Sequence, residues 1–244
     1  MITKTEFKTG LKHCPVALFH PSLIPKFITS GRRGVLKGIV NISIKQGLKY
    51  ALPININCLN HSSMKTLMGK IGGYSQEYLY WLVRIQKPKV VVETGVYRGI
   101  SSAFILAALH DNGEGKLYSI DLPNARYVGD SGIEDFSPLF AKETTGFAVP
   151  ESLKDRWKLI LGDSKHELPK LLRELAVVDF FYHDSEHTYN AMMWEYQTVF
   201  PYLSDNAILS SDDINWNTAF KDFCDTKGLV PNLLMNKFGY TVIS

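Results

Sequence analysis

Cysteine is scarce in this chain of 244 residues, which contains only three copies. Cys14, Cys58 and Cys224 are far apart in the sequence and form no C-x-x-C pair. This spacing argues against the disulfide framework of a small secreted protein and against a zinc knuckle. The scarcity of cysteine therefore predicts a reduced, cytoplasmic protein.

Long apolar runs are also missing. The uncharged stretches 13–25 and 50–64 contain Pro, Asn or His, and both are shorter than the ~20 apolar residues that a membrane span needs. The first residues have no unbroken apolar core after a basic head, so we expect no secretory signal. In contrast, 45% hydrophobic and 12% aromatic residues are enough for one well-cored domain with a modest extra segment, which excludes a disordered protein.

Acidic residues are almost absent from residues 1–70. This segment contains 11 Lys and Arg against one acid, Glu6, whereas residues 71–244 contain 16 against 23. We therefore divide the chain into a basic N-terminal accessory or lid segment, 1–70, and a main domain, 71–244. The charge of the segment favours an anionic partner, and it is equally consistent with docking on the acidic remainder of the same chain.

Part of the basic segment has the pattern of an amphipathic helix. Arg33, Lys37, Lys45 and Lys49 recur at multiples of four residues, beside an apolar row one place earlier. Such helices bind anionic surfaces. The pattern leaves two partners open, which are an anionic small molecule and, through residues 33–49, a peripheral contact with a membrane.

Strand-like and helix-like patterns alternate from residue 75 onward. The alternation predicts an α/β fold, with a mostly parallel sheet and helices on both faces. The expected strands are 89–93, 117–121, 157–161, 178–183 and 207–211, with a terminal hairpin at 233–235 and 240–243. The expected helices begin at 75 and cover 99–110, 165–174, 188–203 and 218–227. Residues 122–150, rich in Pro and Gly, are too long for an ordinary connection and predict an inserted lid or binding element.

Glycine and polar residues follow the first three expected strands. Ligands of an open parallel sheet bind at the carboxyl ends of its strands. The first strand ends in the segment Glu93-Thr-Gly-Val-Tyr-Arg-Gly-Ile-Ser-Ser102. Gly95 and Gly99 in this segment bracket a tight turn into a helix, whose free amides can meet a ligand. Asp121 can accept both hydroxyls of a ribose, and Gly162-Asp163-Ser164 suits an adenine amino group. Any one of these features alone could be a helix cap or a turn. The candidate cofactor residues are Glu93, Gly95, Gly99, Ser101, Asp121, Asp163 and Ser164.

Carboxylates follow the fourth and fifth expected strands. Adjacent strand ends would bring Asp184 close to Asp212 and Asp213. Three carboxylates repel one another unless a cation lies between them, and all-oxygen ligation suits Mg²⁺. The alternative is that Asp184 and Asp212 only cap the helices that follow. His187 can turn toward the same pocket and take a proton near neutral pH, and Glu186 beside it is the competing base.

Four segments together resemble a known family. They are Val92-Glu-Thr-Gly-Val-Tyr-Arg-Gly-Ile-Ser-Ser, Tyr118-Ser-Ile-Asp, Leu161-Gly-Asp-Ser and Phe181-Tyr-His-Asp-Ser-Glu-His-Thr-Tyr. Over residues 74–244 the chain resembles class I S-adenosylmethionine-dependent methyltransferases. It is most similar to the branch that contains macrocin-type O-methyltransferases and cephalosporin-hydroxylase-like proteins. The D-x-x-H-x-Y spacing, combined with the later Asp pair, is the more specific part of the resemblance.

The resemblance implies a Rossmann-like methyltransferase fold with a seven-stranded, mostly parallel sheet and one antiparallel strand. It implies that the first turn holds the methionine end of the cofactor, that Asp121 binds its ribose, and that Asp163 and Ser164 bind its adenine. Asp184, Asp212 and Asp213 would match the metal ligands, and His187 the general base.

The chain departs from the family at two places. Ser185 stands where the family usually has Gly after the first Asp of the motif. Ser204-Asp205-Asn206 stands where the family has a Gly pair, and we expect Asp205 or Asn206 to adopt the left-handed turn instead.

These observations lead to the hypothesis of Mg²⁺-dependent O-methylation of a small hydroxylated acceptor of the sugar or secondary-metabolite type. One alternative is a metal-free methyltransferase. Another is a non-catalytic cofactor-binding module tethered through its basic segment. Nucleic acid ranks last among the partners, because the first motif lacks interleaved aromatic residues. A homo-oligomer is left open.

Overall fold

The computed structural model describes residues 75–124, 126–128, 134–136, 144–234 and 236–243. The basic segment with Arg33, Lys37, Lys45 and Lys49, and the partners expected for it, lie outside the described residues. No helix in the described part of the chain is long and apolar enough to cross a membrane.

The helices are α5 (Ser75–Gln86), α6 (Ile100–Asn112), η2 (Glu151–Arg156), α7 (Ser164–Leu175), α8 (Tyr189–Val199), η3 (Phe200–Tyr202) and α9 (Ala219–Lys227). The strands are β1 (Val90–Thr94), β2 (Lys116–Asp121), β3 (Arg126–Val128), β4 (Glu134–Phe136), β5 (Trp157–Leu161), β6 (Val178–His183), β7 (Leu203–Ser211), β8 (Asn232–Leu234) and β9 (Phe238–Val242).

Seven strands form one sheet in the order β5-β2-β1-β6-β7-β9-β8. Within this sheet β9 is the strand that runs antiparallel to both of its neighbours, and the pairs among β5, β2, β1, β6 and β7 are parallel. The predicted sheet with one antiparallel strand is therefore confirmed. The strand order reverses between β1 and β6, so their carboxyl ends form the switch point at which such sheets bind ligands.

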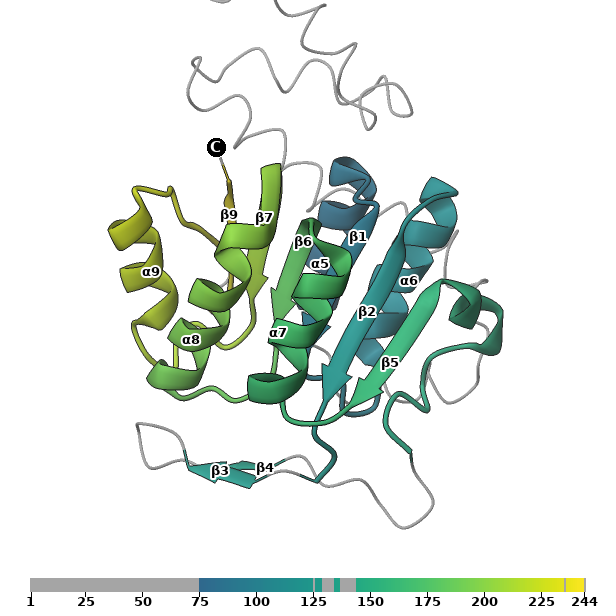
Figure 1. The fold of residues 1–244 in the computed structure, drawn as a ribbon, viewed down its shortest axis with the longest axis horizontal. Helices are drawn as coiled ribbons and strands as arrows, with labels where there is room; N and C mark the ends of the chain where they lie inside the picture. The colour runs from purple at the N-terminus through teal and green to yellow at the C-terminus, as the bar shows by residue number, and fades with distance from the viewer. Residues whose placement is uncertain (1–74, 125, 129–133, 137–143, 235, 244) are drawn as a thin grey trace, which may run out of the picture. The chain divides into compact units, whose positions relative to one another are not determined.

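Helices cover both faces of the sheet (Figure 1). α7, α8 and α9 lie on one face, and α5 and α6 pack together on the other. The central strands are apolar because both of their faces are covered, and Val91, Val92, Phe180 and Phe181 have no exposed surface. Burying one such side chain stabilises the fold by about 1.5–3 kcal/mol, so this core fixes the strand ends that carry the polar residues.

Most predicted strands and helices are confirmed, with a correction between β6 and β7. β5 and β6 have the predicted bounds, but α8 ends at Val199 rather than at Leu203. The cause is Pro201 in the short helix η3, which has no backbone N–H to continue the α-helical ladder. β7 consequently begins at Leu203 instead of Ala207. The expected left-handed residue is Asn206, with a φ of +64°, at an irregularity in the pairing of β6 with β7.

The described parts of the insertion after β2 are a small hairpin and a segment that approaches the glycine turn. β3 and β4 pair in an antiparallel manner. Further along, the N–H of Gly146 donates to the carbonyl of Tyr97 at 2.8 Å, and the N–H of Ala148 donates to that of Arg98 at 2.9 Å. The end of the insertion is therefore held against the turn that follows β1.

Candidate active site

The turn between β1 and α6 is packed tightly against neighbouring backbone. Gly95 and Gly99 both have a φ of +84°, which side chains rarely allow. A Cβ atom on Gly95 would lie 1.8 Å from the carbonyl oxygen of Asp184, because the end of β6 passes beside this turn. A Cβ atom on Gly99 would lie 2.7 Å from the Cα atom of Gly146. Close approach of the backbone accounts for both glycines, and their contact with a cofactor stays a prediction.

Glu93 is buried beneath this turn and supports it. Its carboxylate accepts hydrogen bonds from the hydroxyls of Ser101 at 2.7 Å, Ser102 at 2.6 Å and Ser119 at 2.6 Å. Burial raises the pKa of Glu93 to about 7, although the three hydroxyls favour the charged form. Ser101 is thus directed at Glu93, and direct contact of either residue with a cofactor stays a prediction.

Asp121 at the end of β2 turns its carboxylate toward the glycine turn. Oδ1 accepts the backbone N–H groups of Val96 at 2.8 Å and Tyr97 at 3.1 Å, and Oδ2 accepts the hydroxyl of Thr145 at 3.2 Å. A carboxylate has about four lone-pair sites, so it retains capacity for a ribose hydroxyl. The ribose contact of Asp121 stays a prediction.

The residues predicted to bind adenine make structural contacts. Asp163 is the N-cap of α7, because its Oδ1 accepts the N–H of Lys165 at 2.9 Å. Ser164 forms a hydrogen bond with the carboxylate of Glu195. The helix-cap alternative is therefore confirmed for Asp163, and an adenine contact of either residue stays a prediction.

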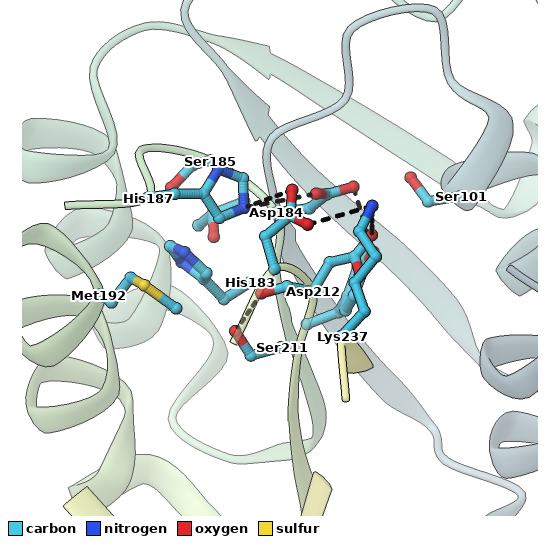
Figure 2. A network of polar contacts seen from close by, with 12 residues as sticks. Ser101, His183, Asp184, Ser185, His187, Met192, Ser211, Asp212 and Lys237 are labelled. Carbon is cyan, nitrogen blue, oxygen red and sulfur yellow. Dashed lines mark hydrogen bonds and ion pairs between the residues drawn. The ribbon is translucent and has the colours of Figure 1, made fainter. Parts of the chain in front are cut away.

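The three carboxylates expected after β6 and β7 lie near enough to one another for their charges to interact, and Lys237 lies beside them. Figure 2 shows Asp184, Asp212 and Lys237 together. Nζ of Lys237 is 3.1 Å from Oδ1 of Asp213 and 3.9 Å from Oδ2 of Asp212. Asp184 accepts a hydrogen bond from the Tyr182 hydroxyl at 3.1 Å. Partial burial and the neighbouring charges of Asp212 and Asp213 raise the pKa of Asp184 well above its ordinary value.

Asp184 and Asp212 do not cap the helices that follow them. The N-cap of α8 is Thr188, whose hydroxyl accepts the N–H of Ala191 at 3.3 Å. The N-cap of α9 is Thr218. The alternative in which these carboxylates serve only as helix caps is therefore wrong.

Glu186 and His187, although adjacent in sequence, have different surroundings. Nε2 of His187 lies 3.8 Å from Oδ1 of Asp184 and 3.9 Å from Oδ2 of Asp213, and its side chain is 6% exposed. Glu186 accepts the hydroxyl of Thr188 at 2.8 Å and pairs with Lys165 of α7 at 3.6 Å. The structure therefore brings His187, and not Glu186, to the acidic cluster.

A buried network behind His187 was not predicted from the sequence. Glu195 of α8 accepts the hydroxyls of Thr94 at 2.5 Å and Ser185 at 2.8 Å, and it lies 2.8 Å from Nδ1 of His183. The rings of His183 and His187 meet edge to face with centroids 5.4 Å apart. Burial alone would raise the pKa of Glu195, but His183 and the hydroxyls outweigh it and hold the pKa below its ordinary value.

Lys237 was also missed, although a signal for it exists in the sequence. The antiparallel pairing of Ser211 with Gly239 sets position 237 opposite position 213. A basic residue in the turn of the terminal hairpin, read together with the Asp pair after the fifth expected strand, would have suggested the contact. Glu195 had a weaker signal, which is a lone acid between Trp194 and Tyr196 in an aromatic helix.

Residues 92–214 match a family described as a methyltransferase domain. The chain belongs to this methyltransferase family. The match spans the glycine turn, the acidic cluster and His187, and the strand order is that of the class I fold. The prediction of an S-adenosylmethionine-dependent methyltransferase of class I is thus confirmed. Among curated proteins the chain finds no match.

Solved structures share the fold of this methyltransferase at low sequence identity. The calicheamicin methyltransferase CalS11 has a TM-score of 0.53 at 18% identity, covering 89% of this chain and 95% of its own. The O-methyltransferase NovP has a TM-score of 0.52 at 16% identity, covering 69% and 79%. SAH-bound PaMTH1, a methyltransferase from Podospora anserina, has a TM-score of 0.50 at 14% identity, covering 70% and 78%. These similarities concern the fold.

Proposed function

We propose that this methyltransferase acts on a hydroxyl oxygen of a small acceptor of the sugar or secondary-metabolite type. One observation carries the proposal, which is that Nε2 of His187 lies within 4 Å of carboxylate oxygens of both Asp184 and Asp213. A histidine flanked by carboxylates is suited to accept a hydroxyl proton, because they stabilise the imidazolium that forms. The names of CalS11 and NovP, a calicheamicin methyltransferase and an O-methyltransferase, support this direction.

The residues at the ends of β1, β2 and β5 fit S-adenosylmethionine. These strands are neighbours in the sheet, so the glycine turn, Asp121 and Asp163 lie along one edge. Gly95, Gly99 and Ser101 would hold the methionine end, Asp121 the ribose, and Asp163 with Ser164 the adenine. When bound, S-adenosylmethionine supplies an electrophilic methyl group whose bond to sulfur breaks as the bond to the acceptor oxygen forms.

The packing of Asp184 against the glycine turn supports an acceptor site beside the cofactor. The carbonyl of Asp184 is packed against Gly95, so the loop that carries His187 begins beside the turn predicted to hold the methionine end. In the proposed reaction His187 takes the hydroxyl proton at Nε2. Glu195 and His183 hold the loop from behind and limit its movement, and positioning of this kind contributes much of the rate enhancement of two-substrate enzymes.

The predicted Mg²⁺ site at Asp184, Asp212 and Asp213 is shared with a lysine side chain. Lys237 already forms ion pairs with two of these three carboxylates. Within the ranges that the structure describes, no three His, Cys, Asp or Glu side chains approach a common point as metal ligands do. This arrangement does not fit Mg²⁺, and the proposed reaction assigns no step to a metal.

Labelled S-adenosylmethionine tests the proposal against a panel of hydroxylated sugars and phenols and their amine analogues. We expect label on the hydroxylated compounds and none on the analogues that lack the hydroxyl. His187→Ala should lower turnover by roughly 10²–10⁴-fold, the usual contribution of a general base, with little change in affinity for S-adenosylhomocysteine. Transfer to the amines alone would contradict O-methylation.

A further inference from the structure

The acidic cluster of Asp184, Asp212 and Asp213 contains a positive charge that the chain itself supplies. Figure 2 shows Lys237 on one side of Asp184 and His187 on the other. Burial alone would lower the pKa of Lys237, but the charges of Asp212, Asp213 and Asp184 outweigh it and hold this pKa above its ordinary value. A lysine side chain that is 51% exposed and paired with carboxylates is an ammonium ion at neutral pH.

The backbone of the terminal hairpin fixes Lys237 in this place. Pairing of Ser211 with Gly239 in the ladder between β7 and β9 sets Lys237 opposite Asp213. Across the same gap, the N–H of Ile214 donates to the carbonyl of Lys237 at 3.0 Å. Asn236 turns the chain with a φ of +57°. Lys237 is thus anchored to the turn that carries Asp212 and Asp213, unlike a lysine on an open surface.

The distances from Lys237 suit an ammonium ion, and among the described residues no three carboxylates are arranged as the ligands of a divalent metal are. Mg²⁺ demands near-octahedral oxygen ligands at about 2.0–2.1 Å. Charge-assisted hydrogen bonds of an ammonium are about 2.7–2.9 Å long and tolerate looser geometry. Lys237 lies 3.1 Å from Asp213 and 3.9 Å from Asp212, which is the pattern of one hydrogen-bonded pair and one longer ion pair.

We infer that Lys237 takes the place of Mg²⁺ in the acidic cluster, so that methyl transfer at this site is independent of a divalent metal. The inference rests on the proposed function. Lys237 acts as a positioning residue, because its charge offsets the repulsion between the carboxylates that flank His187.

Calorimetric titration of the full chain with MnCl₂ tests the inference without relying on activity. The variants are Lys237→Met, which removes the charge, and Lys237→Arg, which keeps it. The control is Lys221→Met on α9, which removes a lysine that pairs with Asp225 at 3.1 Å, away from the cluster. We expect Mn²⁺ binding in Lys237→Met alone, because its three carboxylates then lack an internal cation.

Activity measurements complete the test. Chelator should leave the turnover of the unmodified chain unchanged. Lys237→Met should lose roughly 10- to 10²-fold in metal-free buffer, and Lys237→Arg much less. Mn²⁺ binding by the unmodified chain that disappears in Asp213→Asn would overturn the inference, and so would a folded Lys237→Met that binds no Mn²⁺. If Lys237→Met does not fold, Mn²⁺ titration and activity in chelator of the unmodified chain and of Lys237→Arg still test the inference. A separate titration measures the binding of S-adenosylhomocysteine by the unmodified chain. Absence of that binding would overturn the proposed function, whatever the result with Mn²⁺.

Discussion

The carbonyl oxygen of Asp184 lies so close to Gly95 that a Cβ atom on residue 95 would approach it to 1.8 Å. This contact joins the turn predicted to hold the cofactor to the loop that carries His187. A change at residue 95 therefore disturbs both halves of the site, although Gly95 has no side chain of its own.

Gly95→Ala should destabilise the protein far more than Gly113→Ala, a change at a glycine with open space around it. We expect a loss of more than about 3 kcal/mol in the free energy of unfolding, because backbone must move in addition to the strain of a positive φ. Gly113→Ala is the matched control, with a φ of +76° and open space around the added atom. It should cost about 1–2 kcal/mol, the strain alone. Urea denaturation measures both, and equal losses would refute the close contact.

Glu93 should make the stability of the fold fall as the pH rises. Its pKa is about 7 in the folded protein against an ordinary 4.5, so between these values the folded state binds the proton that the unfolded state has released. The free energy of unfolding then decreases by up to about 1.4 kcal/mol per pH unit over this range and levels off above it.

Glu93→Gln should make this slope smaller, because the amide does not titrate; the contribution of Asp184, whose pKa is also raised, stays. Urea denaturation from pH 4.5 to 8 checks it, with Glu174→Gln, an exposed residue of α7, as the control. The same pH slope in the unmodified chain and in Glu93→Gln would show that Glu93 does not carry the effect.

His187→Ala and Glu186→Gln should separate the two candidate bases. The structure places His187 beside Asp184 and Asp213, whereas Glu186 is engaged with Thr188 and Lys165. We expect the large loss of turnover in His187→Ala and a much smaller one in Glu186→Gln, because the side chain that faces the acceptor hydroxyl is the one that takes its proton. The reverse order of the two losses would make Glu186 the base.

Asp121→Ala and Asp163→Ala should differ in their effect on the stability of the fold. Asp121→Ala should weaken the binding of S-adenosylhomocysteine by roughly 1–3 kcal/mol, because a desolvated group of the cofactor loses its hydrogen-bond partner. Asp163→Ala removes the N-cap of α7 and should lower stability by about 1 kcal/mol. Calorimetry and urea denaturation on both variants give the comparison. Unchanged affinity in Asp121→Ala would contradict the ribose contact.

The fold could be predicted because its signals are local. Unbroken β-branched and aromatic runs such as 89–93 and 178–183 mark buried strands, and their alternation with helical patterns implies a parallel sheet. The end of α8 was predicted four residues too late. Apolar residues continue past Val199 to Leu203, but Pro201 among them is a helix stop that the sequence does show.

The candidate site was predicted less completely, because its key contacts join distant segments. The convergence of Asp184 with the Asp pair followed from strand adjacency. The contact of Lys237 with Asp213 depends on the order and register of β7 and β9, which the sequence alone does not give. The choice between Glu186 and His187 depends on the direction of each side chain in a short loop, which one residue of slip would reverse.

The edge formed by β1, β2 and β5 should bind S-adenosylmethionine. Calorimetric titration of the unmodified chain with S-adenosylhomocysteine and, separately, with NAD measures this binding. We expect one molecule of S-adenosylhomocysteine bound per chain and no binding of NAD. Binding of NAD without binding of S-adenosylhomocysteine would show that this edge is not an S-adenosylmethionine site.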